Sequence, residues 1–134
     1  KYFNKVKKLS NLKKDSNPRV IIIDKVGILP ELYRYSRFAY IGGGFGDGVH
    51  STIEPLVYHN IVCYGPNIDL LDEAKEMHQE GCGFIINNGF EFYNKYLETI
   101  DLNKEKNIKQ SITKYLNEKE CSAEKMYNII SNNV

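Results

Sequence analysis

Four short apolar segments occur in the first two thirds of the chain. Each has four residues with mainly β-branched, aromatic and other apolar side chains. They are too short for helices, so they predict β-strands. These segments are residues 20–23, 38–41, 61–64 and 83–86. The unbroken apolar character of residues 20–23 further predicts that this strand is buried on both faces.

Segments with helical spacing of apolar residues lie between these strands. They are residues 29–36, with Pro30 in the first turn, residues 52–58 and residues 69–79. Alternation of short strands and amphipathic helices implies right-handed crossovers and a parallel sheet that is covered on both sides. The pattern therefore predicts an α/β, Rossmann-like domain of three layers with a parallel sheet of about four strands.

Both ends of the chain are predicted to be helical. Residues 1–14 contain six lysines and an apolar residue at every third position, which indicates a helix with one narrow apolar face. No glycine or proline occurs after residue 90. Three groups of spaced apolar residues predict three helices that pack on the sheet. These groups lie in residues 93–100, 108–116 and 123–130.

Composition and charge exclude several classes of protein. A net charge of +1 over 134 residues is too small for a typical nucleic-acid-binding domain. The sequence shows neither an apolar run of membrane-spanning length nor a secretory leader. Cys63, Cys82 and Cys121 lack the spacing of a disulfide framework or a zinc site. We therefore expect reduced thiols, a soluble cytoplasmic chain, and neither a metal nor a cofactor.

The length suits a single domain over residues 1–134. The sequence opens on a helix-like segment with neither a methionine nor a preceding strand. We therefore expect this domain to be a fragment of a longer protein.

Five of the ten glycines lie within residues 42–48, directly after the second predicted strand. Ligands of open parallel sheets bind outside the carboxyl ends of the strands, where this loop is expected. Loop amides can approach an anion closely, and the next helix adds its positive dipole end. We therefore expect Gly43, Gly44 and Gly46 to line a ligand, the alternative being a mobile turn. The loop is not a dinucleotide fingerprint, because Val49 replaces its third glycine, and it lacks the Lys-Ser or Lys-Thr pair of a P-loop.

The polar residues that follow the strands have two interpretations each. Ser51 and Glu54 have capping-box spacing, but Pro55 lacks the N–H for the first intrahelical hydrogen bond, so Glu54 could instead accept both hydroxyls of a ribose. His50 either donates to a phosphate or sugar carboxylate or closes the loop. Asn67 either faces the ligand crevice or belongs to a tight turn in which it or Asp69 caps the next helix.

These residues and their intervals resemble the donor-binding half of 3-deoxy-D-manno-octulosonic acid (Kdo) transferases, glycosyltransferases of the GT-B fold. The resemblance covers roughly residues 20–86, about half of the chain. It rests on Asp24-Lys25-Val26-Gly27-Ile28-Leu29, Leu32-Tyr33, the run from Tyr40 to Pro55, Gly65-Pro66-Asn67 and Glu73-Ala74.

The resemblance implies an inverting enzyme that moves Kdo from CMP-Kdo to the lipid A precursor in lipopolysaccharide synthesis, at the cytoplasmic face of the bacterial inner membrane. It implies that Val26, Gly27 and Ile28 lie near the cytidine, and that Ser51 and Glu54 bind ribose or phosphate. Ser51 stands where the family usually has the longer side chain of Asn. Apart from the resemblance, the position of Gly27 after the first strand has two interpretations. It either permits a tight turn or lets backbone groups reach a nucleobase.

Two features of the family have no counterpart in residues 1–19: the catalytic glutamate and the arginine-containing phosphate loop. We therefore expect this chain to be inactive alone, with the acceptor domain and any membrane contact on a missing N-terminal part. Two alternatives stay open. One is the donor domain of another GT-B transferase that uses a UDP-sugar, and the other is a non-catalytic Rossmann-like module that binds a partner protein.

Overall fold

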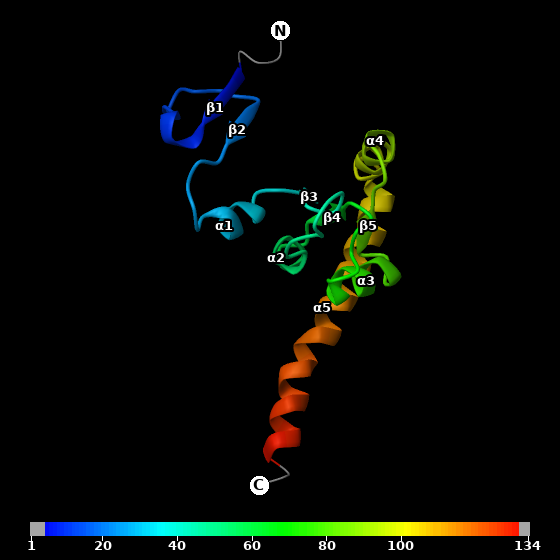
Figure 1. Ribbon diagram of the computed structural model, residues 1–134. Helices are drawn as coiled ribbons and strands as arrows, with labels where there is room; N and C mark the ends of the chain where they lie inside the picture. The colour runs from blue at the N-terminus through cyan, green and yellow to red at the C-terminus, as the bar shows by residue number, and fades with distance from the viewer. Residues whose placement is uncertain (1–4, 132–134) are drawn as a thin grey trace. The chain divides into compact units, whose positions relative to one another are not determined.

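The computed structural model describes residues 5–131, with the backbone alone for residues 120–126. The chain divides into two compact units, Lys1–Leu32 and Tyr33–Val134. Figure 1 shows the elements of both units. The short helix α1 (Leu29–Tyr33) lies at the sequence boundary between them.

The first unit contains a two-stranded parallel sheet. Strand β1 (Val6–Lys8) pairs with β2 (Val20–Ile22), and the 3-10 helix η2 (Leu9–Asn11) follows β1. The connection is held by Ser10, whose amide and hydroxyl donate to the Asp24 carboxylate at 3.0 and 2.6 Å. These hydrogen bonds lower the pKa of Asp24 below its ordinary value.

Two sequence predictions fail in this unit. The described part of residues 1–14 is a strand and a 3-10 helix, not an α-helix, and residues 1–4 lie outside the described residues. A strict three-residue repeat matches a 3-10 helix but drifts around an α-helix of 3.6 residues per turn. Val20, Ile21 and Ile22 are 52, 43 and 48% exposed, so β2 is not buried on both faces. A sheet of two strands has little to pack against its faces.

The second unit is a parallel sheet with helices on both faces. Its strands follow the order β3-β4-β5, and the chain alternates strand and helix from β3 to β5. The elements are β3 (Phe38–Ile41), α2 (Ile53–Val57), β4 (Ile61–Tyr64), α3 (Asp72–Gln79), β5 (Gly83–Ile85), α4 (Gly89–Glu98) and α5 (Leu102–Ser131).

The two faces of this sheet meet different helices, because side chains alternate along a strand. On one face, Phe38 and Tyr40 of β3 contact Phe92 of α4 edge-on, with ring centroids 5.4 and 5.7 Å apart. The other face carries the main core, to which α2, α3 and α5 contribute side chains. That core consists of Ala39, Ile41, Leu56, Val62, Tyr64, Ile68, Ala74, Met77, Cys82, Ile112 and Tyr115.

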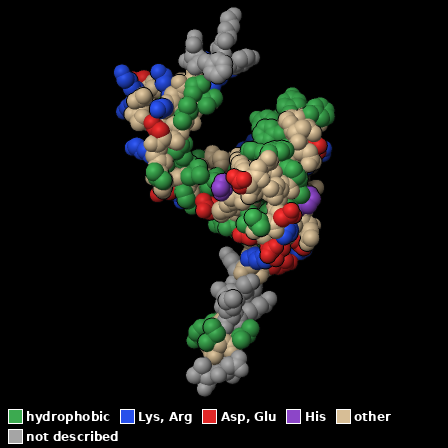
Figure 2. Space-filling view, viewed as in Figure 1, with side chains coloured by type: hydrophobic (Ala, Val, Ile, Leu, Met, Phe, Trp, Pro, Cys, Tyr) green, Lys and Arg blue, Asp and Glu red, His purple; other side chains and the backbone are tan. Residues whose placement is uncertain are grey.

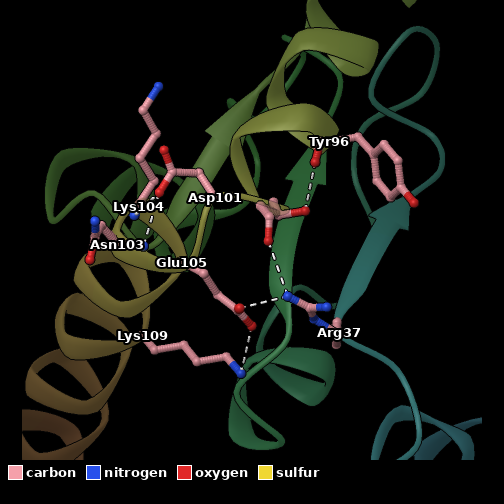
Figure 3. A network of polar contacts seen from close by, with 8 residues as sticks. Arg37, Tyr96, Asp101, Asn103, Lys104, Glu105 and Lys109 are labelled. Carbon is pink, nitrogen blue, oxygen red and sulfur yellow. Dashed lines mark hydrogen bonds and ion pairs between the residues drawn. The ribbon is translucent and has the colours of Figure 1, made fainter.

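Helix α5 is anchored beside the start of β3. Arg37 donates to the Glu105 carboxylate at 2.6 Å and to the Thr99 carbonyl at 3.1 Å, and Lys109 pairs with Glu105 at 2.9 Å (Figure 3). These contacts, with the Lys109 hydrogen bond first, lower the pKa of Glu105. Since Arg37 precedes β3 and the glycine loop follows it, this anchor lies at the opposite end of the strand from the loop.

The predicted α/β class with parallel strands is confirmed, but the strands form sheets of two and three rather than one sheet of about four. Three C-terminal helices were predicted, but the structure has two, because the second and third predicted helices form the single helix α5. No glycine or proline interrupts this 30-residue helix. Among the described residues, no helix has the length and apolarity that crossing a bilayer requires.

Two of the cysteines belong to the core, as predicted for Cys63. Cys63 and Cys82 are fully buried free thiols, and the side chain of Cys121 lies outside the described residues. Burial raises the pKa of Cys63 to about 12 and that of Cys82 to about 11. Such thiols stay protonated at neutral pH and are poor nucleophiles.

Candidate functional site

The glycine loop lines a cavity of about 540 Å³ at the carboxyl end of β3. This is the position where open parallel sheets bind their ligands. Tyr40 and Leu70 complete the lining. The loop itself contributes Gly42, Gly43, Phe45, Gly46, Asp47, Gly48, Val49 and His50. Of the predicted contacts, the structure thus brings together Gly43, Gly46 and His50.

Gly44 has a different role, because it packs against the loop that follows β4. A Cβ on Gly44 would lie 2.6 Å from the Cα of Gly65, and a Cβ on Gly65 would lie 2.5 Å from the carbonyl carbon of Gly44. Both glycines are buried, and Gly44 does not line the cavity. The absence of side chains here lets two backbone segments touch.

Gly43 needs glycine for its conformation. Its φ is +91°, and an added Cβ would overlap the carbonyl oxygen of Gly48. The carbonyl of Gly43 accepts hydrogen bonds from the amides of Gly46 and Gly48, at 2.8 and 3.2 Å. The loop therefore closes on itself at this residue.

Asn67 ties the glycine loop to the β4 end of the sheet. Its backbone amide donates to the carbonyl of Gly44 at 2.9 Å, and its side-chain amide donates to the carbonyl of Gly46 at 2.6 Å. Neither Asn67 nor Asp69 caps helix α3, whose N-cap is Leu71 without a side-chain hydrogen bond. Asn67 does not line the cavity, so the structure places it behind the loop.

The loop's hydrogen bonds engage three of its carbonyls but leave some of its amides without a partner among the described residues. Gly43, Gly44 and Gly46 all accept hydrogen bonds through their carbonyls. Within the described part of the chain, the amides of Gly44, Phe45 and Asp47 have no hydrogen-bond partner. Free backbone N–H groups in a loop favour an anion.

Ser51 and Glu54 do not form the capping box. The N-cap of α2 is Thr52, whose side chain makes no capping hydrogen bond although it is fully buried. Both Ser51 and Glu54 are exposed, and neither side chain makes a hydrogen bond or ion pair with the described residues. Glu54 lies outside the lining of the cavity. Burial, and then the charge of Glu54, raise the pKa of Tyr33.

Val26, Gly27 and Ile28 belong to the first unit, whereas the glycine loop belongs to the second. Val26 is fully exposed. Gly27 has a φ of +85°, a left-handed conformation that favours glycine in a tight turn.

An apolar hollow of about 370 Å³ adjoins the glycine-loop cavity and was not expected from the sequence. It shares Tyr40 and Phe45 with that cavity and reaches Phe92 and the start of α4. Hydrophobic side chains gather over α4 in Figure 2, where Phe90, Tyr93, Tyr96 and Leu97 are exposed. The sequence feature that could have indicated this hollow is the aromatic residue Phe45 inside a glycine-rich loop. It is 60% exposed.

A second hollow and the arrangement of potential metal ligands bear on other possible sites in the described residues. A hollow of about 610 Å³ lies between α2 and α5, lined by side chains such as Val57 and Leu116, and is not formed by the strand ends. No group of three His, Cys, Asp or Glu side chains in the described part of the chain is arranged to hold a metal ion.

Comparisons with known proteins relate the chain to glycosyltransferases. It is 34% identical over 131 residues to a bifunctional glycosyltransferase/methyltransferase of Fusobacterium nucleatum, which covers 94% of this chain and 20% of that protein. It is 36% identical over 93 residues to the 3-deoxy-D-manno-octulosonic acid transferase of Aquifex aeolicus, which covers 68% of this chain and 26% of that enzyme. No family model matches the chain.

A solved structure has the same fold. The C-terminal CMP-Kdo binding domain of WaaA from Acinetobacter baumannii matches with a TM-score of 0.74 and 19% identity, over 84% of this chain and 62% of that domain. The chain spans between a fifth and about a quarter of the length of the two curated relatives above. By sequence it belongs to the 3-deoxy-D-manno-octulosonic acid transferase family, and its fold is that of a C-terminal domain of this family, one half of a GT-B glycosyltransferase.

Proposed function

We propose that this chain is the CMP-Kdo-binding domain of a longer Kdo transferase, one that transfers Kdo to the lipid A precursor in lipopolysaccharide synthesis. The observation that carries the proposal is the glycine-loop cavity, whose free amides suit the phosphate of a nucleotide-sugar, in a chain related to Kdo transferases. The acceptor domain and the cytoplasmic face of the inner membrane as its location are parts of the same proposal.

The chemistry that this domain would support is an inverting displacement. A base outside this chain removes the proton of the acceptor hydroxyl, the hydroxyl oxygen attacks the anomeric carbon of Kdo, and CMP leaves. Negative charge develops on the phosphate as the glycosidic bond breaks. Preorganised amides near that phosphate stabilise this charge without reorganising during the reaction.

The remaining predicted contacts are part of the same proposal. His50 lines the cavity and donates to the phosphate or to the sugar carboxylate. Glu54 has no hydrogen-bond partner among the described residues, so its carboxylate is free to accept the two ribose hydroxyls, with Ser51 beside it. By the resemblance to Kdo transferases, Val26, Gly27 and Ile28 bind the cytidine.

A thermal-shift comparison of nucleotides tests the proposal. A ligand at 100 times its Kd stabilises the folded state by about 2.7 kcal/mol, so CMP should raise the melting temperature measurably. UDP should raise it less at the same concentration. A larger rise with UDP would assign the chain to a UDP-sugar transferase, and no rise with any nucleotide would favour a non-catalytic module.

A further inference from the structure

We propose that Asn67 is a positioning residue, which turns backbone amides of the glycine loop toward an anionic group of the ligand. The inference rests on the proposed function, because it concerns the phosphate of the same nucleotide. It differs from direct contact with the ligand, since Asn67 does not line the cavity and its side-chain nitrogen is engaged with Gly46.

Peptide planarity links these hydrogen bonds to the direction of the amides. In a trans peptide the C=O and the following N–H point in opposite directions. Asn67 holds the carbonyl of Gly44 through its backbone and the carbonyl of Gly46 through its side chain, at 2.9 and 2.6 Å. The N–H groups of Phe45 and Asp47 must therefore point away from Asn67.

We assign the cavity to the side away from Asn67, because Asn67 is not part of its lining. Phe45 and Asp47 both line the cavity, and their amides have no partner among the residues that the structure describes. Without the Asn67 side chain, the peptide between Gly46 and Asp47 would lose the hydrogen bond that holds its carbonyl, and the permissive backbone of Gly46 would let this peptide rotate. A rotated peptide would present a carbonyl oxygen, which repels an anion.

Asp47 itself lines the cavity, and its negative charge opposes anion binding. The free amides must therefore outweigh this charge, which makes their direction more important. The contribution of Asn67 should accordingly depend on whether the ligand carries a phosphate.

The test compares CMP with cytidine, which lacks the phosphate, by isothermal titration calorimetry of the complete chain. The variant is Asn67→Ala, which keeps the backbone amide and removes only the bond to Gly46. The matched control is Asn94→Ala, since Asn94 is exposed on α4 and makes no hydrogen bond through its side chain among the described residues. We expect Asn67→Ala to weaken CMP about tenfold and cytidine less than twofold. Asn94→Ala should change neither.

Equal weakening of CMP and cytidine, or no weakening of either, would overturn the positioning role while leaving the proposed function in place. Failure of the unaltered chain to bind CMP would overturn both. If Asn67→Ala does not fold, amide NMR of the unaltered chain decides. CMP, and not cytidine, should shift the amide proton resonances of Phe45 and Asp47 downfield, and unchanged resonances would refute the inference.

Discussion

At the scale of single residues, the glycines of one loop have separate functions. Gly44 permits contact with Gly65, and Gly43 adopts a left-handed conformation. Gly46 lines the cavity, and a Cβ added to it would lie 3.8 Å from the carbonyl oxygen of Gly43. A glycine-rich sequence therefore does not identify which glycine contacts a ligand. Neighbouring backbone decides that.

Substitutions at Gly44 and Gly46 should separate packing from binding. Gly44→Ala places a Cβ against backbone that cannot move aside, so it should lower the free energy of unfolding by about 1–3 kcal/mol. Gly46→Ala adds only an ordinary contact and should change that free energy little. Urea denaturation measures both. Equal destabilisation by the two substitutions would contradict the packing role of Gly44.

Glu54 gives a second prediction at this scale. Glu54→Ala should weaken CMP binding by about 1.5–3 kcal/mol, because a carboxylate that accepts two ribose hydroxyls makes charge-assisted hydrogen bonds. The midpoint of urea unfolding should stay unchanged, since the structure shows no capping box. Glu31→Ala, at an exposed acidic position of α1, is the matched control. Unchanged CMP affinity with lowered stability would assign Glu54 a capping role instead.

At the scale of elements, sequence periodicity predicted the central strands well and the ends of the chain poorly. β3 and β4 match the predicted segments, because short apolar runs between turns leave few alternatives. The N-terminal helix was wrong because β1 depends on pairing with β2, fourteen residues later in register. The separation of α5 into two helices was wrong because three clusters of apolar residues do not themselves end a helix.

The anchor of α5 predicts a pH dependence of stability. The pKa of Glu105 is lowered in the folded state. The ionised carboxylate therefore adds to the free energy of unfolding above the ordinary pKa of a glutamate, and this stabilisation is lost as the pH falls through the lower pKa of the folded state. Glu105→Gln should lower the free energy of unfolding by about 1 kcal/mol at pH 7. Below pH 4 the difference should shrink, as chemical denaturation at both pH values will show. A difference that is constant with pH would contradict an ionic anchor.

At the scale of the whole molecule, the candidate site combines loops that are distant in sequence. The position of the glycine loop at a strand end could be predicted from the order of strands and helices. Its contact with Gly65 and its hydrogen bonds with Asn67 could not, because they join residues about twenty positions apart through the pairing of β3 with β4. The aromatic hollow depends on α4 meeting β3 and was missed for the same reason.

The chain corresponds to only part of the two relatives, so it is expected to lack transferase activity alone. The two relatives described above are about four to five times longer than the segments aligned to them, so the catalytic base is expected in a different part of the enzyme. The chain alone should not transfer Kdo from CMP-Kdo. Fusion to the acceptor domain of a related Kdo transferase should produce transfer, which chromatography of the lipid product detects. Transfer of Kdo by the unfused chain would contradict the expectation that this chain binds the donor but lacks the catalytic base.

The central claim, that the glycine loop binds a cytidine nucleotide, is tested most directly by an amide NMR titration of the isotopically labelled chain with CMP. The largest shifts should fall on residues 42–50, at the carboxyl end of β3. Saturating CMP that leaves these amides unchanged, or that shifts instead the residues around the hollow between α2 and α5, would contradict it.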